Sequence, residues 1–438
     1  MKKSKKIRVF IFYPVLGIIL IMLTLIIYKL NQSSVFFSEN GVYTSLQVPI
    51  KEKFIDININ LSGTADSTSF TKDFMEGPIV TYNKNQDISV DWFYNGNVYH
   101  KNYSNSIKKF SIDTGDDQLN FMLPNINKPV ITEINNTPNK IVFISDIHGD
   151  HTYMDCTLKN LNVIDSDGNW NFNKNHLVIA GDMVDRGNEV SKVLWKIVAL
   201  SEQARATGGM VHYLIGNHEQ YILKGNFSRV DPLNLYAIEQ MMSFKDAYSD
   251  KTYLGKWLRT RPVIVKIGSM IITHGGISPD TANKNFSLQQ INQAMWDYWE
   301  NKSVDDSLKE VILGKTGVTQ YRGYVRQNDE VKKATPQQID TILETYNASQ
   351  IIVGHTNVAK IKPLYDGKVY DINAIETSSE ALVFEKDTLK VVDIGILKQE
   401  HTYDMYQRDF SFGKINDWKM ITSTIGNIIR LSSISHPY

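Results

Sequence analysis

The sequence predicts an α/β layered domain that follows an amino-terminal transmembrane helix and a small all-β domain. From about residue 140 onward, short apolar runs of strand length alternate with longer amphipathic segments of helix length, as in layered α/β domains. Residues 40–137 show strand-like alternation without a good amphipathic helix. Near the amino end, Val9–Tyr28 has no charged residue over 20 positions, enough to span a bilayer core of about 30 Å as a helix.

These patterns divide the chain into four parts. The predicted parts are a cytoplasmic basic tip with a transmembrane anchor over 1–30, a β-rich domain over 31–137, an α/β domain over 138–398 and a carboxyl-terminal extension over 399–438. The lengths of the two folded parts are reasonable for separate domains.

The amino-terminal segment is predicted to be an uncleaved membrane anchor. Its apolar run is longer than the core of a usual signal peptide, and no clear small-x-small cleavage site follows Lys29. A basic cluster precedes the run and consists of Lys2, Lys3, Lys5, Lys6 and Arg8. Because basic flanks stay in the cytoplasm, the residues after Leu30 are expected outside it, in the periplasm if the source is bacterial.

Residues 31–137 are predicted to form a small antiparallel β-domain, a sandwich. Ile55 and Ile57 alternate with polar residues, which is the periodicity of a half-buried strand. Asn95-Gly96 provides a tight hairpin turn between two further runs of this kind. This part contains no group of residues typical of catalysis. Docking of a wall component or a partner protein is one role that remains open for it.

The 138–398 part is predicted to alternate between strands and helices. Its predicted strands are Ile141–Ser145, Leu177–Ala180, Val211–Ile215, Val263–Ile267, Met270–Thr273 and Ile351–Val353. Its predicted helices are His151–Leu161, Val190–Ala206, Ser287–Trp299 and Thr335–Tyr346. Residues 225–260 and 302–334 lack the strand rhythm and are expected to cap the site. In the tail, apolar residues from Trp418 to Ile428 have the spacing of one helix.

The composition excludes some classes of function. The 47 basic and 47 acidic residues balance, so a general affinity for nucleic acid is not expected. The chain has a single cysteine, Cys156, which excludes an intramolecular disulfide and a cysteine-based metal site.

Five short segments that carry His, Asp or Asn each follow one of the apolar runs. They are Ser145–Asp150, Gly181–Gly187, Gly216–Glu219, Thr273–Gly276 and Gly354–Thr356. The carboxyl ends of strands are where an open α/β sheet usually places its chemistry. Each segment alone has an ordinary structural explanation, such as a turn, a helix cap or a salt bridge. Their joint occurrence in this order indicates a functional site.

The side chains of these segments suit metal binding. Asp146 and His148 are two positions apart on one loop, so one cation can take both. Asp182 can offer one carboxylate oxygen to each of two cations. An amide oxygen and two imidazole nitrogens come from Asn217, His274 and His355. Oxygen and imidazole ligands without thiolate suit manganese, iron or zinc.

The five segments together resemble the PPP-type phosphoprotein phosphatases of the calcineurin-like metallophosphoesterase superfamily. The family pattern is Gly-Asp-x-His-Gly, Gly-Asp-x-Val-Asp-Arg-Gly, Gly-Asn-His-Glu, His-Gly-Gly and Gly-His, and only the first glycine departs from it, as Ser145. Asp185-Arg186 separates this branch from generic metallophosphoesterases. Tyr321-Arg322-Gly323-Tyr324 is similar to a motif of the bacterial-type Shelph branch. The resemblance extends from about Lys140 to Ile396 and implies a β-sandwich flanked by helices.

The resemblance also implies which residues bind two divalent or trivalent metal ions. The first metal would be held by Asp146, His148 and Asp182. The second metal would be held by Asp182, Asn217, His274 and His355. Two cations a few Å apart lower the pKa of a bridging water and polarise a phosphoryl group, which agrees with this arrangement.

Four further residues receive catalytic and substrate-binding roles from the resemblance. His218 would protonate the leaving oxygen, and Asp185 would orient its imidazole. Arg186 and Arg322 would hold the phosphate oxygens, since the guanidinium fork makes paired hydrogen bonds to phosphate.

The expected function is therefore metal-dependent hydrolysis of phosphomonoesters by a membrane-tethered protein phosphatase. Its substrates would carry phosphoserine or phosphothreonine, with phosphotyrosine as a further option, and small phosphoesters are also expected to react. One alternative is hydrolysis of nucleotide or dinucleotide polyphosphates at the same site, which a cap rich in basic residues would favour. Another is a membrane-tethered binding module that keeps the fold, against which the intact set of ligands argues.

Overall fold

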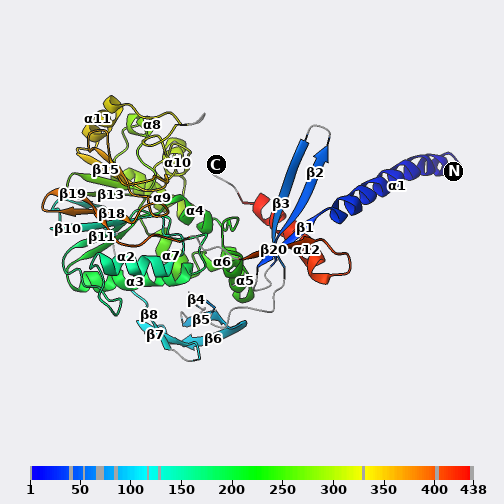
Figure 1. Cartoon of the computed structure of the whole chain (residues 1–438), viewed down its shortest axis with the longest axis horizontal. Helices are drawn as coiled ribbons and strands as arrows, with labels where there is room; N and C mark the ends of the chain where they lie inside the picture. The colour runs from blue at the N-terminus through cyan, green and yellow to red at the C-terminus, as the bar shows by residue number, and fades with distance from the viewer. Residues whose placement is uncertain are drawn as a thin grey trace. The chain divides into compact units, whose positions relative to one another are not determined.

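The protein is described by a computed structural model that places residues 2–38, 43–52, 55–65, 74–82, 87–115, 118–126, 130–327, 331–399 and 404–434. The chain forms two compact units, which are described separately (Figure 1). The smaller unit contains Met1–Phe74 and Thr402–Ser433, and the larger contains Met75–His401 and Ile434–Tyr438.

Two β-sheets form the centre of the larger unit. The first has the order β12-β11-β10-β18-β19 and the second has the order β16-β17-β15-β14-β13-β9. The first sheet consists of β12 (Met210–Tyr213), β11 (His176–Ile179), β10 (Lys140–Ile144), β18 (Glu380–Glu385) and β19 (Thr388–Asp393). The second consists of β16 (Pro363–Leu364), β17 (Val369–Asp371), β15 (Gln350–Val353), β14 (Met270–Thr273), β13 (Ile264–Ile267) and β9 (Glu133–Ile134). The strands β10, β11 and β12 are parallel, as are β14, β15 and β17.

Apolar side chains of both sheets form one buried core. The first sheet contributes Ile141, Phe143, Val178 and Leu382, and the second contributes Val265, Ile267, Met270, Ile272 and Ile352. The two sheets therefore pack face to face, which is how two apolar sheet faces are removed from water. This arrangement confirms the predicted α/β sandwich.

Helices flank the two sheets (Figure 1). The helix α3 (Val190–Ala206) packs on β12, and α9 (Leu288–Trp299) packs on β13. The Ser287 hydroxyl accepts the Gln290 N–H and the Gln290 side chain accepts the Ser287 N–H, which confirms the predicted start of α9. Further helices are α2 (His151–Asn160), α4 (Asn217–Leu223), α5 (Pro232–Met241), α6 (Phe244–Ala247), α7 (Tyr253–Arg259), α8 (Pro279–Asn283), α10 (Asp306–Leu313) and α11 (Pro336–Thr345).

The hairpin β18–β19 was not predicted from the sequence. Its first strand pairs antiparallel with β10 and so extends the parallel part of the first sheet. Its buried apolar stretch is only three residues long, Ala381–Val383, which is too short to stand out as a strand signal.

The predicted single β-domain over 31–137 is divided in the structure. Its later strands lie in the larger unit; they are β4 (Met75–Tyr82), β5 (Ile88–Tyr94), β6 (Asn97–Tyr103), β7 (Lys109–Asp113) and β8 (Gln118–Met122). Trp195 of α3 explains this position. Its ring lies edge-on to Phe110 and Phe121, with centroids 5.9 Å and 5.5 Å away, and its Nε1 donates to the Pro78 carbonyl at 3.0 Å. The alternation pattern thus predicts β5, β6 and β8, but not β4, β7 or the helix on which these strands pack.

The smaller unit combines segments that lie far apart in the chain. Its antiparallel sheet has the order β20-β1-β2-β3, with β1 (Ser34–Ser38), β2 (Tyr43–Glu52), β3 (Ile55–Ala65) and β20 (Met405–Asp409). The predicted tail helix is α12 (Ile415–Ser432), and its Met420 is buried with Val35, Leu46 and Phe410. The predicted carboxyl-terminal extension is therefore part of the same core as the first strands.

The amino-terminal stretch is helical, as α1 (Lys2–Asn31). In the part of the chain that the structure describes, no helix meets the length and apolarity needed to cross a membrane. The side chains of the basic cluster, Lys2 to Arg8, lie outside the described residues. The membrane anchor thus stays a prediction.

A buried carboxyl, Glu76, attaches β4 to the helices of the larger unit. One of its oxygens accepts hydrogen bonds from the Ser191 hydroxyl of α3 and the Gly77 N–H, and the other accepts from the Asn234 amide of α5. Its side chain is 1% exposed. Burial raises the pKa of Glu76 to about 7, although these hydrogen bonds oppose the rise.

The replacement Glu76→Gln should stabilise the protein increasingly as the pH rises. Between pH 4.5 and about 7 the folded chain keeps a proton on Glu76 that the unfolded chain releases, so wild-type stability falls across this window. The pKa shift corresponds to roughly 3 kcal/mol at most. Thermal melting of both proteins from pH 5 to pH 8 measures the difference, with the exposed Glu344→Gln as control. A difference that stays constant with pH would contradict the assignment.

Candidate active site

The five predicted segments meet at the carboxyl ends of the central strands. The segments after β10, β11 and β12 carry Asp146, Asp182 and Asn217, and those after β14 and β15 carry His274 and His355. All five side chains are buried. The polar residues that follow strands of both sheets thus lie in one place, as expected because α/β sheets usually carry their functional residues at the carboxyl ends of strands.

Asp182, Asn217 and His274 form the tightest cluster of ligand atoms. The His274 Nε2 lies 3.0 Å from Asp182 Oδ2 and 3.1 Å from Asn217 Oδ1. His355 completes a group with Asp182 and His274 whose ligand atoms all lie within 4.8 Å of one another. This is the predicted ligand set of the second metal, so the structure brings its four members together.

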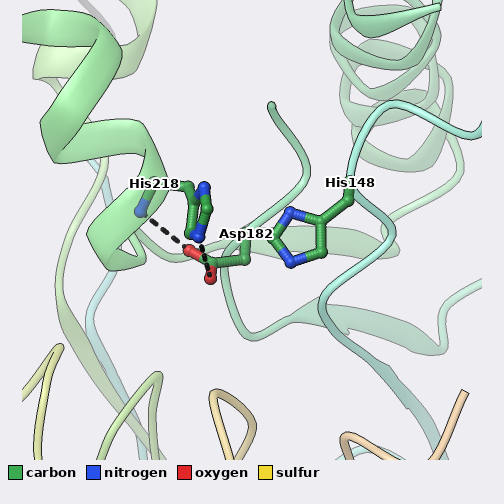
Figure 2. A group of neighbouring side chains, drawn as sticks. All are labelled: His148, Asp182 and His218. Atoms are coloured by element: carbon green, nitrogen blue, oxygen red, sulfur yellow. Dashed lines mark hydrogen bonds and ion pairs between the residues drawn. The ribbon is translucent and has the colours of Figure 1, made fainter. Parts of the chain in front are cut away.

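A second group of possible ligands consists of His148, Asp182 and His218 (Figure 2). Figure 2 shows the two imidazoles turned toward the Asp182 carboxylate, one from the loop before α2 and one from α4. The sequence assigns Asp146 rather than His218 to this group. Among the described residues, Asp146 is a member of neither group; its Oδ2 accepts the His355 N–H at 3.1 Å, and its charge interacts with that of Asp182.

Backbone carbonyls fix the ring orientation of the three predicted histidine ligands. The Nδ1 of His148 contacts the Val184 carbonyl at 2.9 Å, and the Nδ1 of His274 contacts the Ala180 carbonyl at 2.6 Å. The Nε2 of His355 contacts the carbonyl of Gln320, a residue the sequence analysis missed, at 3.1 Å. A neutral imidazole that donates from one ring nitrogen to a carbonyl can offer the lone pair of the other nitrogen to a metal ion. In His148 and His274 the second nitrogen is Nε2, whereas in His355 it is Nδ1, which Arg322 Nη2 contacts at 3.3 Å. The donor set and its outer partners therefore fit two metal ions.

The electrostatics of the cluster favour positive charge between its side chains. Burial alone would raise the pKa of Asp182, yet the nearby His274 and His218 hold it well below its usual range. Burial would lower the pKa of His274, but Asp182 raises it to about 9. The pKa values of His148 and His355 are lowered, mainly by burial, which favours the neutral imidazole that metal binding requires.

His218 and Asp185 form a buried pair beside the cluster. The His218 Nδ1 lies 2.8 Å from Asp185 Oδ2, and its Nε2 lies 3.8 Å from Asp182 Oδ2. The carboxylate thus fixes the imidazole with Nε2 directed into the site. This geometry is what a positioned proton donor requires.

The two predicted phosphate-binding arginines lie at different depths. Arg186 is half exposed, and its Nη1 is 3.9 Å from the Glu376 carboxylate. Arg322 is more buried; its Nη1 donates to the His355 carbonyl at 2.6 Å and its Nη2 lies 3.3 Å from His355 Nδ1. Arg326, a second arginine four residues further along this segment, is exposed. The contacts therefore favour Arg322 as the arginine that reaches the cluster.

Glu219 is a residue of the site to which the sequence analysis gave no role. Its carboxylate accepts the N–H groups of Asp182, Met183 and Gly216 at 2.7 to 2.9 Å and the Tyr213 hydroxyl at 2.8 Å. It therefore ties the loop after β11 to the start of α4. Its position in the Gly-Asn-His-Glu segment is the feature of the sequence from which a role in the site could have been inferred.

Six residues of the site have left-handed backbone conformations. Their φ angles lie between 51° and 67°. These residues are Asp146, His148, Asp182, Asp185, Arg186 and His355. Gly181 adds a close approach, because a Cβ there would lie 2.7 Å from the Gly216 nitrogen. Left-handed backbone in residues with side chains is uncommon and concentrates at functional sites.

Comparison with protein families supports this site. Residues 139–359 match the family described as calcineurin-like phosphoesterase. The chain is 29% identical over 225 residues to Shewanella-like protein phosphatase 1 of Plasmodium berghei, covering 50% of this chain and 61% of that protein. It is 32% identical over 111 residues to Shewanella-like protein phosphatase 2 of Arabidopsis thaliana, covering 25% of this chain and 28% of that protein. The chain thus spans less than two thirds of either curated relative.

A solved structure covers more of the chain. It is the cold-active protein-tyrosine phosphatase of a psychrophile Shewanella species, with a TM-score of 0.66 and 29% identity over 73% of this chain and 97% of that chain. The predicted resemblance to the Shelph branch of PPP phosphatases is confirmed by these relatives.

Asp182→Asn should abolish binding of the metal pair. The change removes a charge from between two cations, and an amide offers one oxygen where the carboxylate offers two. We expect metal content to fall to a small fraction of two ions per chain, measured by elemental analysis after dialysis. Asp167→Asn, in an exposed turn, serves as control. Full metal content in the Asp182 variant would refute the two-metal site.

Proposed function

Since the chain belongs to the calcineurin-like phosphoesterase family, we propose that it is a two-metal phosphomonoesterase that dephosphorylates proteins. The two curated relatives are named protein phosphatases and the Shewanella structure a protein-tyrosine phosphatase, which supports a phosphoprotein substrate. The observation that carries the proposal is the His218–Asp185 pair beside a cluster of metal ligands.

Each group of the site has a part in the proposed reaction. Two metal ions, held by Asp146, His148 and Asp182 and by Asp182, Asn217, His274 and His355, would activate a water and polarise the phosphoryl group. Arg186 and Arg322 bind phosphate oxygens and align the ester. His218 gives its Nε2 proton to the leaving oxygen, and Asp185 holds the ring in place and stabilises its charged form.

A substrate panel tests the proposed activity. Purified protein with its metals measured is assayed on phosphoserine, phosphothreonine and phosphotyrosine peptides, on small phosphomonoesters and on dinucleotide polyphosphates. We expect phosphopeptides to be the best substrates. A clear preference for dinucleotide polyphosphates would favour the alternative function, a dinucleotide polyphosphate hydrolase. Inactivity on every substrate of the panel at full metal loading would indicate a binding module.

His218→Asn should slow phosphoserine peptides much more than nitrophenyl phosphate. A serine alkoxide needs a proton as its bond to phosphorus breaks, whereas nitrophenolate is a stable leaving group. A positioned general acid contributes roughly 10² to 10⁴-fold, so we expect a loss in this range for the peptide. Steady-state kcat/KM for both substrates measures the difference.

Asp185→Asn is the matched variant and should give a milder form of the same pattern, because it only orients the ring. Metal content should stay near normal in both variants. Equal losses on both substrates, or loss of metal in the His218 variant, would contradict the role of His218 as proton donor.

We also propose that α1 anchors the chain in a membrane with the larger unit outside the cytoplasm. The uncharged run of 20 residues, Val9–Tyr28, and the basic cluster before it support this orientation. A reporter fused after Tyr438 that works only outside the cytoplasm should be active. Activity of a reporter that works only in the cytoplasm would contradict the orientation.

A further inference from the structure

Tyr221 of α4 contacts several parts of the site, although neither the sequence motifs nor the proposed chemistry uses it. Its hydroxyl oxygen accepts hydrogen bonds from Asn217 Nδ2 at 3.2 Å and from Gln320 Nε2 at 3.3 Å. Its ring lies edge-on to His218, with centroids 5.4 Å apart. The guanidinium of Arg229 lies over the ring, 4.9 Å from its centre.

The hydroxyl determines which end of the Asn217 amide faces the other ligands. An amide has a donor end and an acceptor end of nearly the same shape, so only its hydrogen bonds decide its orientation. Asn217 Nδ2 donates to Tyr221, and Oδ1 therefore lies 3.1 Å from His274 Nε2. A metal ion between these side chains can bind only the oxygen. Tyr221 is four residues after Asn217, so the helix itself places the two side chains together.

The ring of Tyr221 fixes Arg229 beside the loop that carries Arg186. Arg229 is exposed, and an exposed arginine is otherwise free to adopt many conformations. The cation–π contact holds its guanidinium near the site. The Arg229 carbonyl accepts the Arg186 N–H at 2.9 Å, so the two arginines belong to adjoining loops. A guanidinium in this position can bind the phosphate or an anionic group next to it.

We propose that Tyr221 is a positioning residue with two separable roles. Its hydroxyl orients the amide of the metal ligand Asn217, and its ring positions Arg229 as a further anion-binding group. The proposal rests on the two-metal site of the proposed function, but both roles concern binding and are measurable without turnover.

Three variants separate the roles of the hydroxyl and the ring. Tyr221→Phe should weaken Mn²⁺ binding to the metal-stripped full chain by roughly 10 to 100-fold, the usual effect of losing an outer partner of a metal ligand. Its affinity for inorganic phosphate at saturating Mn²⁺ should change less than about twofold, because the ring remains. Tyr221→Leu should weaken both. Arg229→Ala should weaken phosphate binding alone. Calorimetric titration measures both affinities.

Two controls distinguish positioning from a general loss of stability. Tyr103→Phe removes a tyrosine hydroxyl of β6 that donates to the carbonyl of Ser111 in β7 at 2.6 Å, and it should leave both affinities unchanged. In an Asn217→Asp background, Tyr221→Phe should not weaken Mn²⁺ binding further, because a carboxylate presents an oxygen in either orientation.

Wild-type Mn²⁺ affinity in Tyr221→Phe, or an equal loss in the Asn217→Asp background, would overturn the role of the hydroxyl. Equal phosphate affinities in the Phe and Leu variants would overturn the role of the ring. A wild-type chain that binds Mn²⁺ and phosphate but hydrolyses no phosphoester would refute the proposed function and leave this inference standing.

Discussion

The geometry of the site depends on the hydrogen bonds of one buried carboxylate, that of Glu219. Its four donors come from the end of β12, from the loop after β11 and from the start of α4. A buried carboxylate without partners would cost several kcal/mol, so these donors must stay in place for the fold to be stable. Asp182, Asn217 and His218 lie on the backbone segments that Glu219 holds together. The spacing between Asp182 and His218 is therefore a property of the folded core.

The sequence predicts most of the candidate site because its signals are local. Apolar runs predict β10, β11, β12, β14 and β15, and each predicted ligand directly follows one of these strands. Ser287 and Gln290 predict the start of α9 in the same way, through contacts within one helical turn. In each of these segments, contacts between residues close in sequence determine the local structure, so the sequence pattern alone is enough to predict it.

The features that were missed depend on contacts between distant segments. Strand alternation predicts β5, β6 and β8 but not β4 or β7, and it does not reveal that Trp195, far along the chain, is what this part packs on. The Gln320 carbonyl contacts His355, 35 residues further on, and no motif connects the two. Glu76 likewise shows nothing unusual in the sequence, because only the fold brings Ser191 and Asn234 to it.

The pairing of β1 with β20 determines the order in which the protein can form during its synthesis. The five registered pairs, from Ser34 with Asp409 to Ser38 with Met405, join segments that lie far apart in the chain, so β1 is synthesised well before β20. Domains generally fold as they emerge, so the larger unit can complete its core while β1 still has an open edge. An open strand edge readily pairs with other chains. A nascent or truncated chain that lacks β20 would therefore expose its first strand to a chaperone or to a second copy.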